Sequence, residues 1–171
     1  MVLLLAGCGS AAAGQSSPRP ALKSLSADGS LNIGESDRCP VCAMFPHRHP
    51  QTAAGLTLTN GDTFYFCSNG CLLRTWLRPV VYLGRPQSAI DRLTVRDYFS
   101  GAPVDGRTAT WVAGSDVIGP MGPAIVALGD ENQLTAFKNR HGGRAVFSLD
   151  QLDDTLWRRI HHAELPDPIS P

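Results

Sequence analysis

Two pairs of cysteines carry the clearest chemistry in this 171-residue chain. Cys39 and Cys42 are separated by two residues in a loop that contains two prolines, and Cys67 and Cys71 are separated by three residues. Thiolates are soft ligands that select soft metal ions, with Cu(I) first among those that a sulfur site meets outside the cytosol. The four cysteines therefore predict a sulfur-rich metal site.

Two methionines extend the set of possible ligands. Met44 follows the first cysteine pair by two positions, and Met121 lies in the turn-forming run Gly119-Pro-Met-Gly-Pro123. Most methionines fill gaps in a core, but a thioether beside two thiols, or in a rigid turn, is available to an ion. A thioether suits Cu(I) and is a poor ligand for Zn(II). Participation of either methionine would therefore favour copper over zinc.

The same cysteines support two other hypotheses. Four thiolates can hold a structural Zn(II) ion in an interaction module. An exported chain lies in an oxidising compartment, where four cysteines can form two disulfides in three alternative pairings. The residues alone thus leave open a Cu(I) chaperone, a zinc module and a disulfide-stapled lipoprotein without metal.

The N-terminal residues predict a lipid anchor. Leu5-Ala6-Gly7-Cys8 has the pattern of a lipobox, in which an apolar run and two small residues precede the cysteine that receives the lipid. No basic residue precedes the short apolar run, so we expect that the true start lies upstream. We interpret residues 1–8 as the remnant of a lipoprotein signal and residues 9–35 as a disordered, small-residue tether. This places the protein on the extracytoplasmic face of a bacterial membrane, in the periplasm, anchored through Cys8.

Composition narrows the function classes. The chain has 15 basic and 15 acidic side chains, which give zero formal net charge, and no basic stripe. Nucleic acid is therefore not an expected partner. The acidic residues form no paired constellation and no Ser-His-Asp arrangement is visible, so we do not expect an enzyme.

The residues around the second cysteine pair predict a hairpin followed by a helix. Two β-prone runs, 51–59 and 62–67, flank Asn60-Gly61, a pair that tolerates the positive φ angles of a type I′ turn. Ser68 or Asn69 can then cap a short helix at 70–77. Cys67 should end a strand and Cys71 should lie in the first helical turn, where the helix N-terminus lowers a thiol pKa.

A similar order of elements recurs further along the chain. Periodicity predicts strands at 93–98, 108–112, 124–128 and 144–147, a helix that opens at 130–133, and a last helix that opens at 148–151. The apolar face of the last helix would be Leu149, Leu152, Leu156 and Ile160. We therefore expect an α+β fold of two small similar ββαβ-type lobes, residues 36–90 and 91–163, with a disordered tail at 164–171.

Several motifs together resemble the NosL family, the accessory lipoproteins of nitrous oxide reductase. The matching residues are Cys39-x-x-Cys42-x-Met44-Phe45, Val95-x-Asp97-Tyr98, Ala109 to Ser115, and Gly119-Pro-Met-Gly122, in order over residues 37 to 152. The resemblance implies two homologous ββαβ lobes and a membrane-anchored protein that delivers Cu(I) to the reductase. The copper ligands that it implies are Cys42, Met44 and Met121.

The chain departs from the NosL pattern in two places. The usual Cys-Gly-Met is Cys42-Ala43-Met44 here, which predicts an ordinary negative φ at Ala43. The pair Cys67 and Cys71 is not typical of the family, and the segment Tyr65 to Cys71 instead looks like the YHS/TRASH type of small metal module. This second departure favours metal binding in general over a role specific to the reductase.

Overall fold

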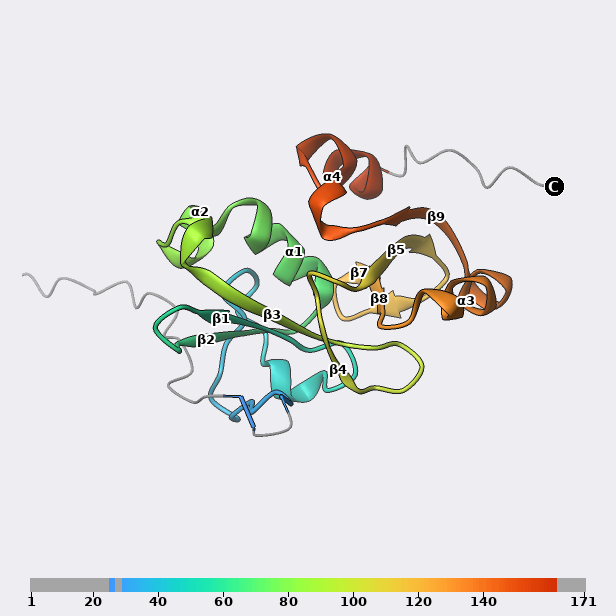
Figure 1. Cartoon of the computed structure of the whole chain (residues 1–171). Coiled ribbons are helices and arrows are strands. Elements are labelled where there is room, and N and C mark those ends of the chain that lie inside the picture. The colour runs from blue at the N-terminus through green and yellow to red at the C-terminus, as the bar shows by residue number, and fades with distance from the viewer. Residues whose placement is uncertain (1–24, 27–28, 163–171) are drawn as a thin grey trace, which may run out of the picture.

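The computed structural model describes residues 25–26 and 29–162 (Figure 1). The lipobox with Cys8, most of the expected tether, residue 163 and the expected tail at 164–171 lie outside these described residues. Residues 29–35, the last part of the expected tether, lie inside. Leu31 approaches Gly55 of the first sheet so closely that a Cβ on the glycine would lie 2.7 Å from the leucine side chain. A residue of the expected tether therefore contacts β1.

The first sheet has four antiparallel strands in the order β2-β1-β3-β4. Its strands are β1 (Ala54–Leu58), β2 (Thr63–Phe66), β3 (Ile90–Arg96) and β4 (Pro103–Asp105). Two helices, α1 (Asn69–Leu77) and α2 (Pro79–Leu83), connect β2 to β3 and lie on one side of the sheet (Figure 1). The expected hairpin and the helix after it are both present.

The second sheet has three antiparallel strands in the order β8-β5-β9. Its strands are β5 (Thr110–Ser115), β8 (Val126–Leu128) and β9 (Gly142–Phe147). A small hairpin of β6 (Ile118–Gly119) and β7 (Gly122–Pro123) joins β5 to β8, and helix α3 (Leu134–His141) joins β8 to β9. Helix α4 (Asp154–His161) follows. Short 3-10 turns occupy Pro46–Arg48, Gln87–Ala89, Glu131–Gln133 and Leu149–Gln151.

The two sheets repeat one arrangement of strands. In each, the first strand lies in the middle, the next strand flanks it on one side, and a strand that follows a helix flanks it on the other. The sheets do not divide where we expected, after residue 90. Strand β3 pairs with β1 over Gly55–Leu58, so it belongs to the first sheet. The local pattern shows that 90–96 is a strand but cannot show which neighbour completes its hydrogen bonds.

Two local expectations are wrong. In the part of the chain that the structure describes, Ala43 is the only non-glycine residue at positive φ, so Asn60 does not form a type I′ turn. The Asn60 side chain instead bonds to Asp62, and Gly61 alone takes a positive φ of 88°. The last helix begins at Asp154 rather than near residue 148, because Ser148 caps only a 3-10 turn and Asp153 caps the helix.

One large core joins the two sheets. Trp111 of β5 is fully buried in the same cluster as Leu56, Leu72 and Leu93 of the first sheet and its helix. The indole N–H of Trp111 donates to the carbonyl of Gly106, 3.1 Å away, which satisfies its one polar atom. A smaller cluster on the far side of the second sheet contains Phe137. None of the described helices is long and apolar enough to cross a membrane.

Asp97 fixes the second sheet against the first. Its Oδ1 accepts the amide N–H of Gly129 (2.8 Å), and its Oδ2 accepts the amides of Phe99 and Ser100 and the Ser100 hydroxyl. Asp97 also forms a parallel bridge with Ala127 of β8. Burial would raise the pKa of Asp97, but the hydrogen bonds from Gly129, Ser100 and Phe99 outweigh it, and the pKa lies below its usual value.

The Asp97 joint yields a prediction about acid stability. We expect Asp97→Asn to lower the free energy of unfolding by about 1.5–3 kcal/mol at pH 7, since hydrogen bonds to a charged acceptor are lost. A lowered folded-state pKa contributes stability that is present above the unfolded pKa of about 3.9 and is lost as pH falls through the folded value. Urea unfolding at several pH values should show this loss of unfolding free energy at low pH in the parent but not in Asp97→Asn. The exposed Asp91 on β3 provides the control, and an equal effect of Asp91→Asn would contradict the prediction.

Candidate metal centre

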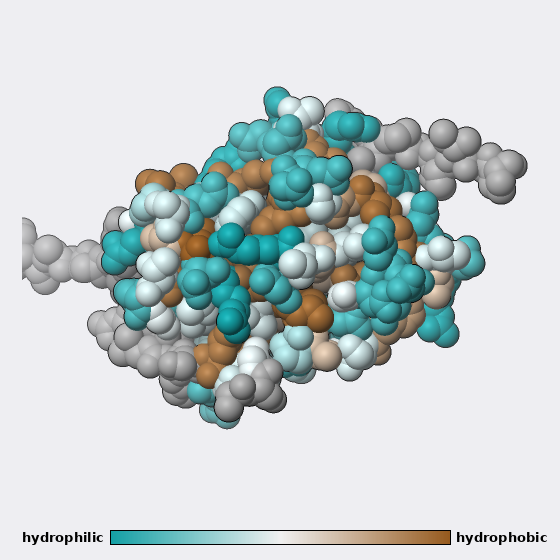
Figure 2. Space-filling model, viewed as in Figure 1, coloured by the Kyte–Doolittle hydropathy of each residue, from teal (hydrophilic) through white to brown (hydrophobic). Residues whose placement is uncertain are grey.

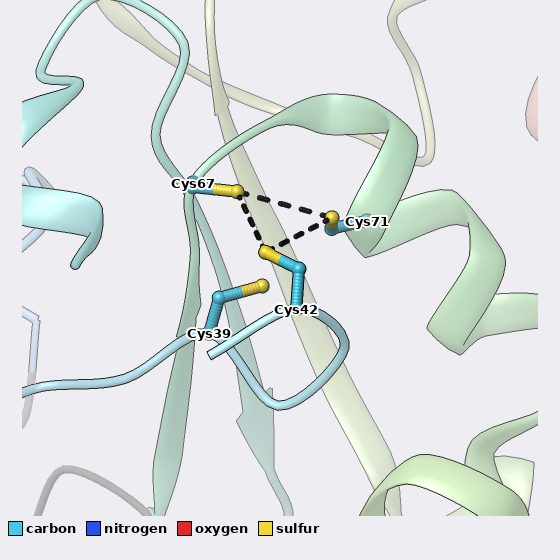
Figure 3. A group of neighbouring side chains, drawn as sticks. All are labelled: Cys39, Cys42, Cys67 and Cys71. Carbon is cyan, nitrogen blue, oxygen red and sulfur yellow. Dashed lines mark hydrogen bonds between the residues drawn. The ribbon is translucent and has the colours of Figure 1, made fainter. Parts of the chain in front are cut away.

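The four cysteines come together from two separate segments. Cys39 and Cys42 lie in the loop before the first 3-10 turn, Cys67 directly follows β2, and Cys71 lies in the first turn of α1. Figure 3 shows the four sulfur atoms turned toward one another between this loop and the start of the helix. The positions predicted for Cys67 and Cys71 are therefore confirmed.

The spacing of the sulfurs suits one metal ion. All four Sγ atoms lie within 4.8 Å of one another. The Sγ of Cys42 is 3.4 Å from that of Cys67 and 4.0 Å from that of Cys71, and the last two are 3.9 Å apart. Four sulfurs at about 2.3 Å from one ion would lie roughly 3.8 Å apart in a tetrahedron. All four are free thiols, at separations far beyond the ~2.05 Å of a disulfide bond.

Local hydrogen bonds hold each segment in place. The Ser68 hydroxyl accepts the Cys71 amide (3.3 Å), which caps α1 and orients the cysteine of its first turn. In the loop, the Cys39 amide donates to the Met44 carbonyl and the Ala43 amide donates to the Cys39 carbonyl, both at 2.9 Å. These bonds close a tight turn around Cys42.

That turn requires a left-handed residue at position 43. Ala43 has φ +60°, so the expectation of an ordinary φ there is wrong. Left-handed backbone costs an L-residue roughly 1–2 kcal/mol, because its Cβ approaches the following carbonyl oxygen. The alanine therefore keeps the conformation that a glycine would adopt more easily.

Three of the four thiols are almost completely buried. Cys39, Cys67 and Cys71 are 2%, 0% and 4% exposed, whereas Cys42 is half-buried. The neighbouring thiols of Cys67 and Cys71 lower the pKa of Cys39, and Cys39 in turn raises the pKa of Cys67 and of Cys71. The pKa of Cys71 therefore rises, although we expected the helix N-terminus to lower it. Ionisation of one sulfur opposes ionisation of its neighbours, because like charges repel.

The structure does not gather the two methionines with the thiols in the same way. Met44 is half-buried and packs against the core cluster that contains the cysteines. Met121 is 53% exposed at the turn between β6 and β7. Met121 and Cys71 nonetheless line one cavity between the two sheets. Sequence patterns give no sign of this cavity, because its walls come from segments far apart in the chain.

Taken together, the fold and the cysteine cluster define a small two-sheet α+β protein with a four-thiol centre that could hold a metal ion. The family model of NosL matches residues 30–157, which include both sheets and all four cysteines of the cluster. The chain belongs to the NosL family.

Two relatives support this assignment. The copper-binding lipoprotein NosL of Stutzerimonas stutzeri is 26% identical over 155 residues, which cover 89% of this chain and 75% of that protein. The crystal structure of the copper chaperone NosL from Shewanella denitrificans has the same fold, with a TM-score of 0.60. The match covers 75% of this chain and 98% of that one at 21% sequence identity. The expected family and the mixed α+β fold are confirmed.

Proposed function

We propose that this protein binds Cu(I) at the cysteine cluster and passes it to a copper enzyme, of which nitrous oxide reductase is the strongest candidate. It acts from the extracytoplasmic side of a membrane, to which a lipid on Cys8 anchors it. The observation that carries the proposal is the convergence of four free thiols within 4.8 Å in a chain of the NosL family. Copper is the cargo here, and binding and transfer take the place of catalysis.

Ligand exchange is the mechanism that fits such a cargo. Two or three thiolates satisfy Cu(I) and leave one side of the ion open to an incoming ligand. A sulfur or imidazole of the acceptor can bind there, form a bridged intermediate and draw the ion away. The half-buried Cys42 is the sulfur that solvent and a partner reach most directly, since the other three are at most 4% exposed. We therefore assign the exchange step to Cys42.

A structural zinc module is the second candidate function. The gathering of four sulfurs within 4.8 Å, three of them 3.4 to 4.0 Å apart, favours it, because Zn(II) takes four thiolates in closed structural sites. Full coordination by four thiolates would also slow release, which suits a permanent ion better than a cargo. The number of sulfur ligands in the loaded protein separates the two candidates.

Metal competition is the first test of the proposal. We expect the reduced protein to bind Cu(I) much more tightly than Zn(II), because soft ligands prefer the softer ion. Competition against chromogenic chelators gives both affinities, and X-ray absorption gives the number of sulfurs around the ion. Two or three sulfurs around copper would support a chaperone. Stronger zinc binding with four sulfurs would instead support the structural module.

Two substitutions test which sulfurs hold copper. Cys42→Ser should weaken Cu(I) binding strongly, because it removes a thiolate from the cluster. If Met121 also binds the ion, Met121→Ala should cost about one to three kcal/mol, or roughly tenfold to a hundredfold in affinity, by analogy with the loss of one strong polar contact. Chelator competition measures both effects. Thermal melting of the metal-free proteins is the control, since Met121 is exposed and should not support the fold.

If Met121→Ala binds Cu(I) as tightly as the parent, the β6–β7 hairpin is not part of the copper site. The copper-binding role that the resemblance to NosL implies for the Gly-Pro-Met-Gly loop would then be wrong for this chain. Cys39, Cys67 and Cys71 would become the ligands that complete the site with Cys42.

The lipid anchor has its own test. We expect mass spectrometry of the membrane fraction from a native host to find Cys8 acylated at the N-terminus of the mature protein. The Leu-Ala-Gly-Cys pattern directs cleavage before this cysteine. Cys8→Ser should shift the protein to the soluble fraction. An unmodified Cys8 in the membrane fraction would refute this part of the proposal.

A further inference from the structure

A large cavity lies between the two sheets and borders the metal centre. Its volume is about 1040 Å³, at the upper end of the range of about 300–1,000 Å³ for small-molecule sites. One wall contains Ser68 to Cys71 at the start of α1, and the opposite wall contains the β6–β7 hairpin and β8. A ligand in this cavity would therefore lie beside Cys71.

The cavity is positively charged, although the chain as a whole is neutral. Arg74, Arg96 and Arg140 line it, and Asp97 is the only acidic residue among its lining residues. Three guanidinium groups against one carboxylate leave a charge of +2. The Asp97 carboxylate is already occupied by the hydrogen bonds of the sheet joint. It therefore compensates little of the charge that faces the cavity.

The arginines have unused hydrogen-bonding capacity. Within the described residues, the side chains of Arg74 and Arg140 make no hydrogen bond and no ion pair. Arg96 donates to the carbonyl of Gly101, but its buried Nε atom has no partner. Guanidinium groups form strong, often paired hydrogen bonds to carboxylates and related anions. An organic anion would use these free donors.

Apolar side chains form much of the rest of the wall. Phe99, Ile118 and Met121 line the cavity, with exposed fractions of 41%, 71% and 53%. The other large exposed hydrophobic residues among those described are Val80, Val81 and Val146, which lie elsewhere. Figure 2 shows one face of the molecule, on which hydrophobic residues emerge between hydrophilic ones near the middle of the view. A ligand with an apolar body would cover the exposed side chains.

We propose that this cavity binds an organic anion with an apolar body, and that copper carried by such an anion enters the cluster past Cys71. The first half rests on the charge and lining of the cavity alone. The second half rests on the proposed function, because it requires a cluster that accepts Cu(I).

The first experiment uses no copper. The probe is anilinonaphthalene sulfonate, an apolar anion whose fluorescence rises on binding, added to the reduced, metal-free full chain. We expect one site, and we expect Arg74→Glu/Arg140→Glu to weaken binding by on the order of tenfold or more, because charged hydrogen bonds are replaced by repulsion. Arg92→Glu, an exposed control on β3 outside the cavity, should bind like the parent. Near-ultraviolet circular dichroism checks that the variants are folded.

The second experiment uses copper-loaded protein. We would measure the rates at which dianionic bathocuproine disulfonate and uncharged neocuproine remove Cu(I). In the Arg74→Glu/Arg140→Glu variant, the anionic chelator should remove Cu(I) about tenfold more slowly than in the parent, since steering by the arginines is lost. The uncharged chelator should react at the parental rate, and Arg92→Glu should change neither rate.

The outcomes separate the two proposals. Equal sulfonate binding by the parent and the double variant, or equal weakening by Arg92→Glu, would overturn the anion site. A chain that binds the sulfonate through the arginines but retains no Cu(I) would leave the anion site and refute the proposed function. Deletion of residues 163–171, which carry Glu164 and Asp167, tests whether the chain itself supplies the anion. Tighter sulfonate binding after this deletion would mean that the C-terminal residues compete for the cavity. It would overturn the proposal that the cavity binds an anion from outside the chain.

Discussion

A buried carboxylate bonds the two sheets of the molecule to each other. Asp97, which directly follows β3, accepts three donors from its own turn and one from Gly129 at the end of β8, so the end of β3 is bonded directly to the second sheet. An unpaired charge at this position would be costly, and the amide of Gly129, beside the second sheet, supplies the one partner that the Asp97 turn does not. The carboxylate thereby fixes how the β6–β7 hairpin and β8 face the start of α1.

The cysteine cluster depends on a different constraint, which is local. Each cysteine pair is set by short-range bonds: a tight turn around Cys42, and a serine cap that orients Cys71. The first sheet only has to bring these two preformed segments into contact. The result is a cluster in which three thiols are buried and one is half-buried. Such an arrangement combines shelter from solvent with one accessible sulfur, and a protein that both holds and releases an ion needs both.

The sequence predicted most features that depend on neighbouring residues. The Asn-Gly hairpin, the Ser68 cap and the positions of Cys67 and Cys71 all follow from interactions within a few residues. Assignment of β3 to the second lobe failed, because hydrogen bonding to β1 joins residues more than 30 positions apart. The start of the last helix was misplaced because two capping residues, Ser148 and Asp153, compete within one short segment. Arg74, Arg96 and Arg140 come from three elements, so no local pattern indicates that they line one cavity.

The left-handed Ala43 has a consequence for the strain held in the cysteine loop. Its methyl group makes the observed backbone conformation cost roughly 1–2 kcal/mol, a cost that a glycine would not have. The hydrogen bonds between Cys39 and Ala43 and between Cys39 and Met44 hold the residue there. Exchange between alanine and glycine at this single position would thus change how readily the loop departs from the shape that brings Cys42 to the other sulfurs.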